Sequence, residues 1–196
     1  MIKRTTAENR NKILSAYKDN VAFAEGPVIE QFAPADHSKP DFFRVKEVKS
    51  VISLKAETHN FPTTVEPFNG AATGTGGEIR DRMGGGVGSW PLAGTAVYMT
   101  SYPRKEDGVR PWEEIMPVRE WLYQTPEQIL IKASNGASDF GNKFGQPLIC
   151  GSVLTFEQQE HGEKYAYDKV IMLAGGVGYG TQRDCLKGKP EKGNKV

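Results

Sequence analysis

The stretch Ile52-Ser53-Leu54-Lys55-Ala56-Glu57-Thr58-His59-Asn60-Phe61-Pro62 sets the framework of this sequence. Apolar and polar residues alternate along its first half, which predicts a β-strand from Val48 to Glu57. On such a strand Lys55 and Glu57 share one face, about 6.8 Å apart. An ammonium can meet phosphate oxygens as a point charge, and a carboxylate supplies the hard oxygen that Mg²⁺ prefers. A solvated ion pair worth under ~1 kcal/mol would explain the same spacing.

His59 follows at the predicted strand end, before a loop over His59–Gly70 that Pro62 and Pro67 interrupt. Loop positions beside a rigid strand often hold catalytic groups. A histidine there can accept a proton near neutral pH and act as a general base. A loop histidine bonded to backbone is the alternative.

A second signal is the stretch Gly70-Ala71-Ala72-Thr73-Gly74-Thr75-Gly76-Gly77-Glu78-Ile79-Arg80-Asp81. It lacks the Gly-Lys-Ser/Thr ending of a P-loop, and no clear strand leads into it as in a dinucleotide fingerprint. As a helix, it would place Gly70, Gly74, Gly77 and Asp81 on one face and let backbone approach a ligand closely. Asp81 would then be a second magnesium ligand, with Arg80 beside it for an anion. A flexible glycine loop with a surface Arg-Asp pair is equally compatible.

A third signal is the run of small residues over Ala133–Gly145. Thr125-Pro126-Glu127 predicts the helix start, because it offers a cap, a proline at the first position and then an acid. Gly141, Gly145 and Pro147 predict its end. We favour close packing over ligand binding as the reason for the small residues.

The rest of the chain predicts a mixed α/β protein with about four strands and three helices. A capping box at Thr5–Glu8 predicts a helix to about Asn20, and the prolines of residues 24–44 predict a linker or extended arm. The further predicted segments are strands at Leu92–Tyr102, Leu148–Glu157 and Val170–Val177, a long excursion over 103–124, and a frayed tail over 187–196.

Charge and cysteine usage exclude several classes of protein. Lys+Arg total 25 and Asp+Glu total 24, so the chain has no electrostatic footprint for nucleic acid or an anionic membrane. No apolar run approaches the roughly 20 residues of a membrane helix. Cys150 and Cys185 form no Cys-x-x-Cys pair, so we expect no zinc site and a reduced, cytoplasmic protein.

Taken together, Lys55–Pro62, Gly70–Asp81, Ala133–Pro147 and Met172–Gly178 resemble the phosphoribosylformylglycinamidine synthase family, in its order and at plausible spacing. The form His-Asn-Phe-Pro resembles the large single-chain type, although many members carry a second histidine where this chain has Phe61. The resemblance implies a ligase of purine biosynthesis. It would convert formylglycinamide ribonucleotide, ATP and glutamine-derived ammonia to formylglycinamidine ribonucleotide.

The resemblance also implies roles for individual residues. Glu57 and Asp81 would hold Mg²⁺, and His59 would be the general base. The ATP contacts would be Lys55, Gly70, Ala71, Ala72, Thr73, Gly74, Thr75, Gly76, Gly77, Glu78, Ile79, Arg80 and Asp81. The substrate would be lined by Thr58, His59, Asn60, Phe61 and Arg80.

The fold implied is the α/β (α+β) N-terminal domain shared with aminoimidazole ribonucleotide synthetase, a small mixed sheet packed with helices. We expect an N-terminal helix and linker over 1–44, an ATP- and substrate-binding domain over 45–186 and a tail over 187–196. Two such domains pair their sheets in the family, and this chain holds one. It is therefore expected to be a fragment of the first synthetase half, inactive alone, that works with the remaining domains of a parent enzyme or pairs as a homodimer.

Two other functions remain open from the sequence. A nucleotide-binding structural half-domain without turnover would carry the same motifs, although the intact Glu57–Asn60 run favours the catalytic half. A magnesium-dependent hydrolase unrelated to the family would need a nucleophile or a denser carboxylate cluster, which the sequence does not offer.

Overall fold

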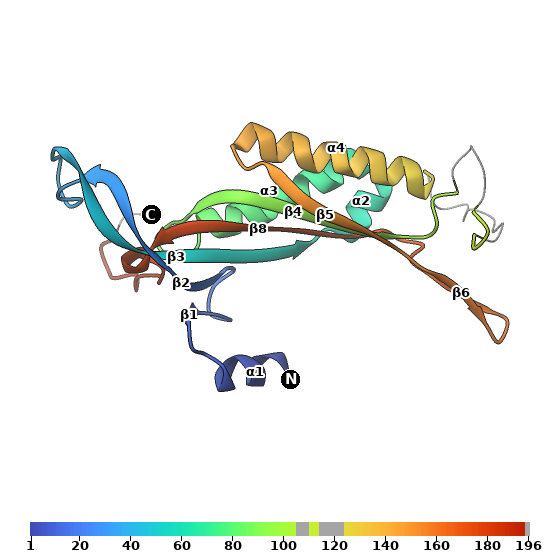
Figure 1. The fold of residues 1–196 in the computed structure, drawn as a ribbon, viewed down its shortest axis with the longest axis horizontal. Helices are drawn as coiled ribbons and strands as arrows, with labels where there is room; N and C mark the ends of the chain where they lie inside the picture. Colours follow the sequence, from blue (N-terminus) through green and yellow to red (C-terminus); the bar gives the residue numbers. More distant parts are fainter. Residues whose placement is uncertain (105–109, 114–123, 195–196) are drawn as a thin grey trace. The chain divides into compact units, whose positions relative to one another are not determined.

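The computed structural model describes residues 1–104, 110–113 and 124–194 (Figure 1). Within these residues a six-stranded mixed sheet has the order β1-β2-β3-β8-β4-β5. The pairs β1–β2 and β2–β3 are antiparallel, and β4–β5 is parallel. The predicted mixed α/β class is confirmed, with more strands than the sequence indicated.

The elements have the following bounds. The strands are β1 (Ile13–Ser15), β2 (Ala22–Pro34), β3 (Phe43–Thr58), β4 (Trp90–Thr100), β5 (Leu148–Thr155), β6 (Glu157–Glu160), β7 (Glu163–Ala166) and β8 (Ile171–Thr181). The helices are α1 (Ile2–Glu8), α2 (Asn60–Val65), α3 (Pro67–Met83), α4 (Pro126–Phe144) and the 3₁₀ turn η1 (Gln182–Asp184).

The chain divides into two compact units. The first contains Met1–Lys55, Asp81–Pro91 and Val177–Val196, and the second contains Ala56–Arg80 and Leu92–Gly176.

The N-terminal part of the first unit differs from the predicted helix. Helix α1 ends at Glu8, and β1 follows where the helix was expected to continue to Asn20. Pairing of Ile13 with Ala24 gives these backbone groups partners in the sheet. Tyr17 has φ 61°, a left-handed conformation that a helix cannot contain.

Of the two alternatives predicted for residues 24–44, a linker or an extended arm, the linker is wrong, because β2 and the start of β3 form a long extended hairpin there. Pro27 lies where the register shifts between Glu25 and Val28, so its missing N–H interrupts no regular ladder bond. The Ser50 hydroxyl donates to the Pro27 carbonyl at 2.6 Å. Proline therefore marks a bulge here, and it does not end the strand. The buried apolar residues of this unit are Val21, Phe23, Val51 and Cys185.

In the second unit, the predicted loop over His59–Gly70 is replaced by two helices. Helix α2 begins at Asn60 and α3 at Pro67. Pro62 and Pro67 both fall in the first turn of a helix, where the N–H that proline lacks has no intrahelical partner. The helical interpretation of the glycine-rich stretch is thereby confirmed.

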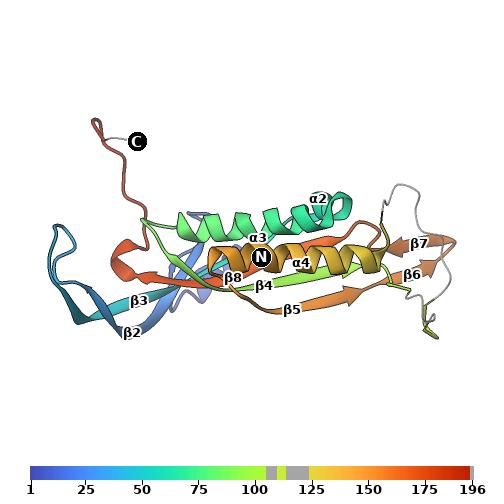
Figure 2. The same ribbon diagram turned by 90° about the horizontal axis from the view of Figure 1, so that it is seen from above.

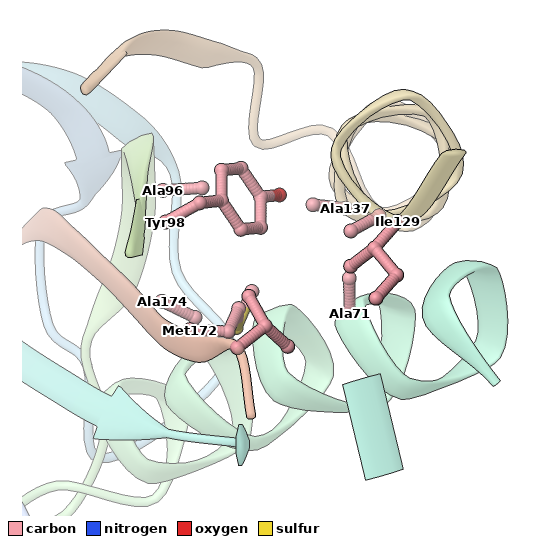
Figure 3. Close-up of a cluster of buried hydrophobic side chains, with 9 residues drawn as sticks. Ala71, Ala96, Tyr98, Ile129, Ala137, Met172 and Ala174 are labelled. Atoms are coloured by element: carbon pink, nitrogen blue, oxygen red, sulfur yellow. The ribbon is translucent and has the colours of Figure 1, made fainter. Parts of the chain in front are cut away.

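The core of the second unit lies between the sheet and helix α4. The Tyr98 ring extends from β4 toward Ala137 and Ile129 of α4, and Met172 extends from β8 (Figure 3). Ala133 completes the buried stripe of α4 at helical spacing. The predicted helix start is confirmed, because Thr125 and Gln128 form a reciprocal capping box, and Gly145 ends the helix at φ 85°.

The small residues of α4 serve close packing, as predicted. A Cβ at Gly136 would lie 2.0 Å from the Phe68 carbonyl oxygen, and one at Gly141 would lie 2.6 Å from that of Gln146. Backbone therefore approaches the helix at both positions, and a larger residue would separate the elements.

The other predicted strands are confirmed with shifted bounds as β3, β4, β5 and β8. Hairpin β6–β7 extends beyond the end of β5 (Figure 2). The Arg104 guanidinium pairs with the Glu157 carboxylate at its base. The predicted excursion over 103–124 lies largely outside the described residues. No helix among the described residues is long and apolar enough to span a membrane. Both cysteines are free thiols.

Candidate functional site

The end of β3 presents Lys55 and Glu57 on one face, as the alternation predicts. Both side chains are half-buried, whereas the intervening Ala56 and the preceding Leu54 are exposed. The strand periodicity of two therefore holds through Thr58.

In the first unit, Lys55 meets Asp81. The Lys55 Nζ lies 2.7 Å from Asp81 Oδ2, and the two side chains are 16% and 24% exposed. The other carboxylate oxygen, Asp81 Oδ1, accepts a hydrogen bond of 3.3 Å from the Asn20 amide. Two of the predicted site residues are thus brought together, and each oxygen of the acid has its own partner.

In the second unit, His59 and Asn60 hold the segment after β3 against strand β8. The His59 backbone N–H donates to the Met172 carbonyl at 2.9 Å. The Met172 N–H in turn donates to the Asn60 side-chain oxygen at 3.0 Å. A side-chain amide therefore replaces the backbone carbonyl of a sheet ladder, and it fixes where His59 leaves the strand.

Two threonines tie down the helix that follows. The Thr63 hydroxyl donates to the His59 carbonyl and the Thr64 hydroxyl to the Asn60 carbonyl, at 2.5 and 3.1 Å. Both threonines are fully buried. Within the described residues, His59 Nδ1 is buried and has no hydrogen-bond partner. The backbone around His59 is thus constrained, while one ring nitrogen keeps its bonding capacity, which is a common state for a functional group.

The glycine face of α3 packs against this same segment. A Cβ at Gly70 would lie 2.5 Å from the Pro62 and Thr63 backbone, and one at Gly74 would lie 2.9 Å from His59 Cβ. At Gly77, by contrast, a Cβ would meet only ordinary contacts, 3.7 Å from Glu57 and 3.8 Å from Arg80. Gly70 and Gly74 therefore let the helix approach the His59 segment, and of these three glycines only Gly77 has room for a Cβ beside predicted site residues.

The remaining residues predicted to contact ATP divide by exposure. Glu78 is fully buried and accepts a hydrogen bond of 2.5 Å from Gln146. Ala71, Thr75 and Ile79 are also buried, and Gly76 lies against the Phe140 ring. Ala72 is half-buried, whereas Thr73 and Arg80 are exposed. Thr58 and Phe61, predicted to line the substrate, are exposed as well.

Sequence reasoning missed Asn20, Met172 and Gln146 as partners of predicted site residues. Asn20 fell within the wrongly predicted helix. Met172 and Gln146 act through a backbone N–H and a buried amide, for which no local pattern exists. Only the polar turn Lys18-Asp19-Asn20 before an apolar strand could have directed attention to Asn20.

The donor set is compatible with magnesium held together with a nucleotide. No group of three or more His, Cys, Asp or Glu side chains gathers at one point in the part of the chain that the structure describes. Mg²⁺ bound with a substrate phosphate commonly uses only one or two carboxylates and keeps several waters. Asp81, half-buried and paired with a lysine that a phosphate could take over, meets that requirement.

Comparison with known proteins extends this description. No protein-family model matches the chain. A probable chloroplastic/mitochondrial phosphoribosylformylglycinamidine synthase of Arabidopsis thaliana is 38% identical over 197 residues and covers all of this chain. The synthases of Dictyostelium discoideum and Homo sapiens are each 37% identical and cover 100% and 97% of it. Over this segment, the chain belongs to the phosphoribosylformylglycinamidine synthase family. It spans about 14% of the length of these relatives.

Solved structures related to this family share the fold. The Thermotoga maritima PurLQS structure superposes with a TM-score of 0.57 at 12% identity, over 93% of this chain and 24% of that one. T. maritima PurL complexed with ADP gives a TM-score of 0.50 at 18% identity, over 97% and 23%. The expected synthetase fold is confirmed.

Proposed function

We propose that this chain forms part of the ATP- and substrate-binding site of a formylglycinamidine ribonucleotide synthase of purine biosynthesis. In this reaction ATP phosphorylates the amide oxygen of formylglycinamide ribonucleotide, which gives ADP. Ammonia derived from glutamine then forms a bond to the amide carbon, and phosphate leaves. The observation that carries the proposal is the Lys55–Asp81 pair of the first unit, in a chain of this family whose second unit contains the constrained His59–Thr64 segment.

Charge determines the roles proposed at the first part of the site. Lys55 binds a phosphate oxygen of ATP, and the exposed Arg80 is a second cation for an anionic group. Asp81 and Glu57 provide carboxylate oxygens for Mg²⁺, which would neutralise charge on the ATP phosphates. Since Lys55 now pairs with Asp81, phosphate binding would release the carboxylate for the cation.

The roles at the second part follow from how the segment after β3 is held. His59 is the general base, and one of its ring nitrogens takes the proton that ammonia loses on attack. Exposed Thr58 and Phe61 line the substrate. Asn60, also predicted to line the substrate, contributes by holding the start of α2, because its side-chain oxygen accepts from the Met172 N–H. The glycine-rich stretch contributes backbone near Gly77 and exposed Thr73.

Substitution of Glu57 tests this function in the natural protein that contains these residues. With ATP, formylglycinamide ribonucleotide and ammonia, Glu57→Gln is expected to lower kcat/KM about 100-fold, the typical cost of losing one electrostatic contact to the transition state. Glu47→Gln on the same strand, at an exposed position, is the matched control. Equal kinetics for the two variants would remove Glu57 from the site.

Other parts of the proposal follow from the length of the relatives. Residues 1–196 span about 14% of a relative, so we expect them to give no turnover alone and to need a glutamine-hydrolysing module elsewhere. The domain boundaries at 44 and 186 and the cytoplasmic location stay predictions. A nucleotide-binding half-domain without turnover is the alternative, and the Glu57 experiment distinguishes it.

Self-association is a further element of the proposal. In the first unit, Ile52 and Leu54 are 38% and 44% exposed, on the opposite side of β3 from buried Val51 and Ser53. An apolar sheet face favours a partner, and a second copy would meet it by twofold symmetry. Sedimentation of residues 1–196 at tens of micromolar should show a dimer, and a clean monomer would contradict this.

A further inference from the structure

We propose that Asn20 is a positioning residue of the magnesium–nucleotide site, because its side-chain amide holds one oxygen of Asp81 and leaves the other for a cation. The inference rests on the proposed function of Asp81. It adds a residue from the N-terminal segment that neither the motifs nor the resemblance indicated.

The two oxygens of Asp81 have different environments. Oδ1 accepts from Asn20 Nδ2 at 3.3 Å, and Oδ2 lies 2.7 Å from Lys55 Nζ. A carboxylate held by only one oxygen can rotate about its terminal torsion, which is broad. The Asn20 contact therefore fixes the plane of the group. Oδ2 remains directed at the place that Lys55 now fills and that a metal ion can take when the lysine meets phosphate.

Asn20 is itself anchored by its neighbour. Asp19 Oδ2 accepts from the Gly86 N–H at 2.9 Å, and Oδ1 lies 3.2 Å from Lys187 Nζ. The Asn20 N–H also donates to Asp19 Oδ1 at 2.8 Å. Burial acts to raise the pKa of Asp19, but the backbone N–H groups of Gly86 and Asn20, helped by Lys187, outweigh it and lower the pKa. Asp19 is therefore ionised, and its contacts with Gly86 and Lys187 hold the turn Lys18-Asp19-Asn20 in place.

The backbone around Gly86 has the conformation that the Gly86–Asp19 hydrogen bond requires. Gly86 has φ 59°, and a Cβ there would lie 2.2 Å from the Asp184 carbonyl oxygen. Only glycine suits a left-handed position with backbone this close. The Val87 N–H also donates to Asp184 O at 2.8 Å. The loop that presents the Gly86 N–H to Asp19 is thus fixed on its far side, and the line of contacts runs from Asp184 through Gly86 and Asp19 to Asn20.

The Asn20 contact itself is suited to positioning more than to stability. Asn20 is exposed, and a neutral hydrogen bond at the surface contributes little net free energy because water replaces it. Removing the amide should leave folding almost unchanged while Asp81 loses its orientation. Metal-dependent binding is consequently the property that Asn20 controls.

The test uses Mn²⁺ with ATP as the probe and the natural protein that contains these residues. Asn20→Leu is expected to weaken Mn²⁺–ATP binding about fivefold, the equivalent of one hydrogen bond, with metal-free ATP binding and unfolding midpoint unchanged. Lys18→Ala, in the same turn, is the control and should change none of these. In the unsubstituted protein, Mn²⁺–ATP should broaden the Asn20 side-chain amide signals in an NMR spectrum through its unpaired electrons.

Two further outcomes separate this inference from the proposed function. If Asp81→Asn weakens Mn²⁺–ATP binding but Asn20→Leu does not, and the Asn20 signals stay sharp, the inference is overturned and the site stands. If Asp81→Asn has no effect on Mn²⁺–ATP binding, the proposed metal role of Asp81 is wrong and the inference is overturned with it.

Discussion

The segment His59–Thr64 and the pair Lys55–Asp81 both belong to the predicted site. They are held in place by different kinds of interaction. The segment is fixed by backbone and buried hydroxyl bonds, which leave His59 Nδ1 without a partner among the described residues. The pair is partly buried, with side chains 16% and 24% exposed, and the Lys55 ammonium lies against the Asp81 carboxylate. One part is therefore built before a ligand arrives, whereas the other must exchange partners to bind one.

The largest effect that separates the two regions is expected at the glycine face of α3. Gly70→Ala should lower the free energy of unfolding by about 3 kcal/mol, because the new Cβ meets backbone that cannot move aside. Gly77→Ala is the matched control. Its Cβ meets only ordinary contacts, and alanine gains up to about 1 kcal/mol of helix propensity. Denaturant unfolding of both variants checks this, and equal shifts would show that α3 does not press on the segment.

A somewhat smaller effect on the free energy of unfolding is expected at alkaline pH from Tyr98, which lies in the same buried cluster as Met172. Burial raises the pKa of Tyr98 to about 12. The unfolded phenol loses its proton near pH 10, so between pH 10 and 12 the folded state binds more protons and stability falls by about 2 kcal/mol. Tyr98→Phe should remove this fall and cost little at pH 7, because the Tyr98 hydroxyl has no hydrogen-bond partner among the described residues. Unfolding midpoints from pH 8 to 12 measure it, and parallel curves for the two proteins would contradict it.

The hydrogen bond from the Met172 N–H to the Asn60 side chain should contribute about 1–2 kcal/mol to the free energy of unfolding, since its loss leaves the N–H without that acceptor. Asn60→Leu removes the acceptor, whereas Asn60→Asp keeps an oxygen in its place and should lose less. Amide hydrogen exchange at Met172 should accelerate in the leucine variant and much less in the aspartate variant. The same rate in all three proteins would mean that the segment is held by other contacts.

The smallest effect on the free energy of unfolding is expected at the Lys55–Asp81 pair. Lys55→Gln should change the free energy of unfolding by under about 1 kcal/mol, because partly exposed ion pairs are weak. A loss as large as that of Gly70→Ala, measured in the same denaturant series, would assign Lys55 to the framework and not to a binding site.

The sequence predicted the parts of this site that local periodicity determines. Strand alternation placed Lys55 and Glu57 together, and helical spacing grouped Gly70, Gly74 and Gly77. Which way that glycine face points could not be read from spacing, because it depends on where the His59 segment folds back. The N-terminal error had a similar cause, since the residues after Glu8 find hydrogen-bond partners in β2, a contact between distant residues. Asn20 was missed for the same reason.

The most direct test of the account is calorimetry of Mg²⁺–ATP on the natural protein that contains these residues and on its Asp81→Asn and Lys55→Gln variants. The account predicts that each substitution weakens binding at least about tenfold, the effect of losing one charge-assisted contact. It also predicts that removing Mg²⁺ abolishes the difference between Asp81→Asn and the unsubstituted protein. Equal affinity for all three proteins in Mg²⁺ would contradict the account.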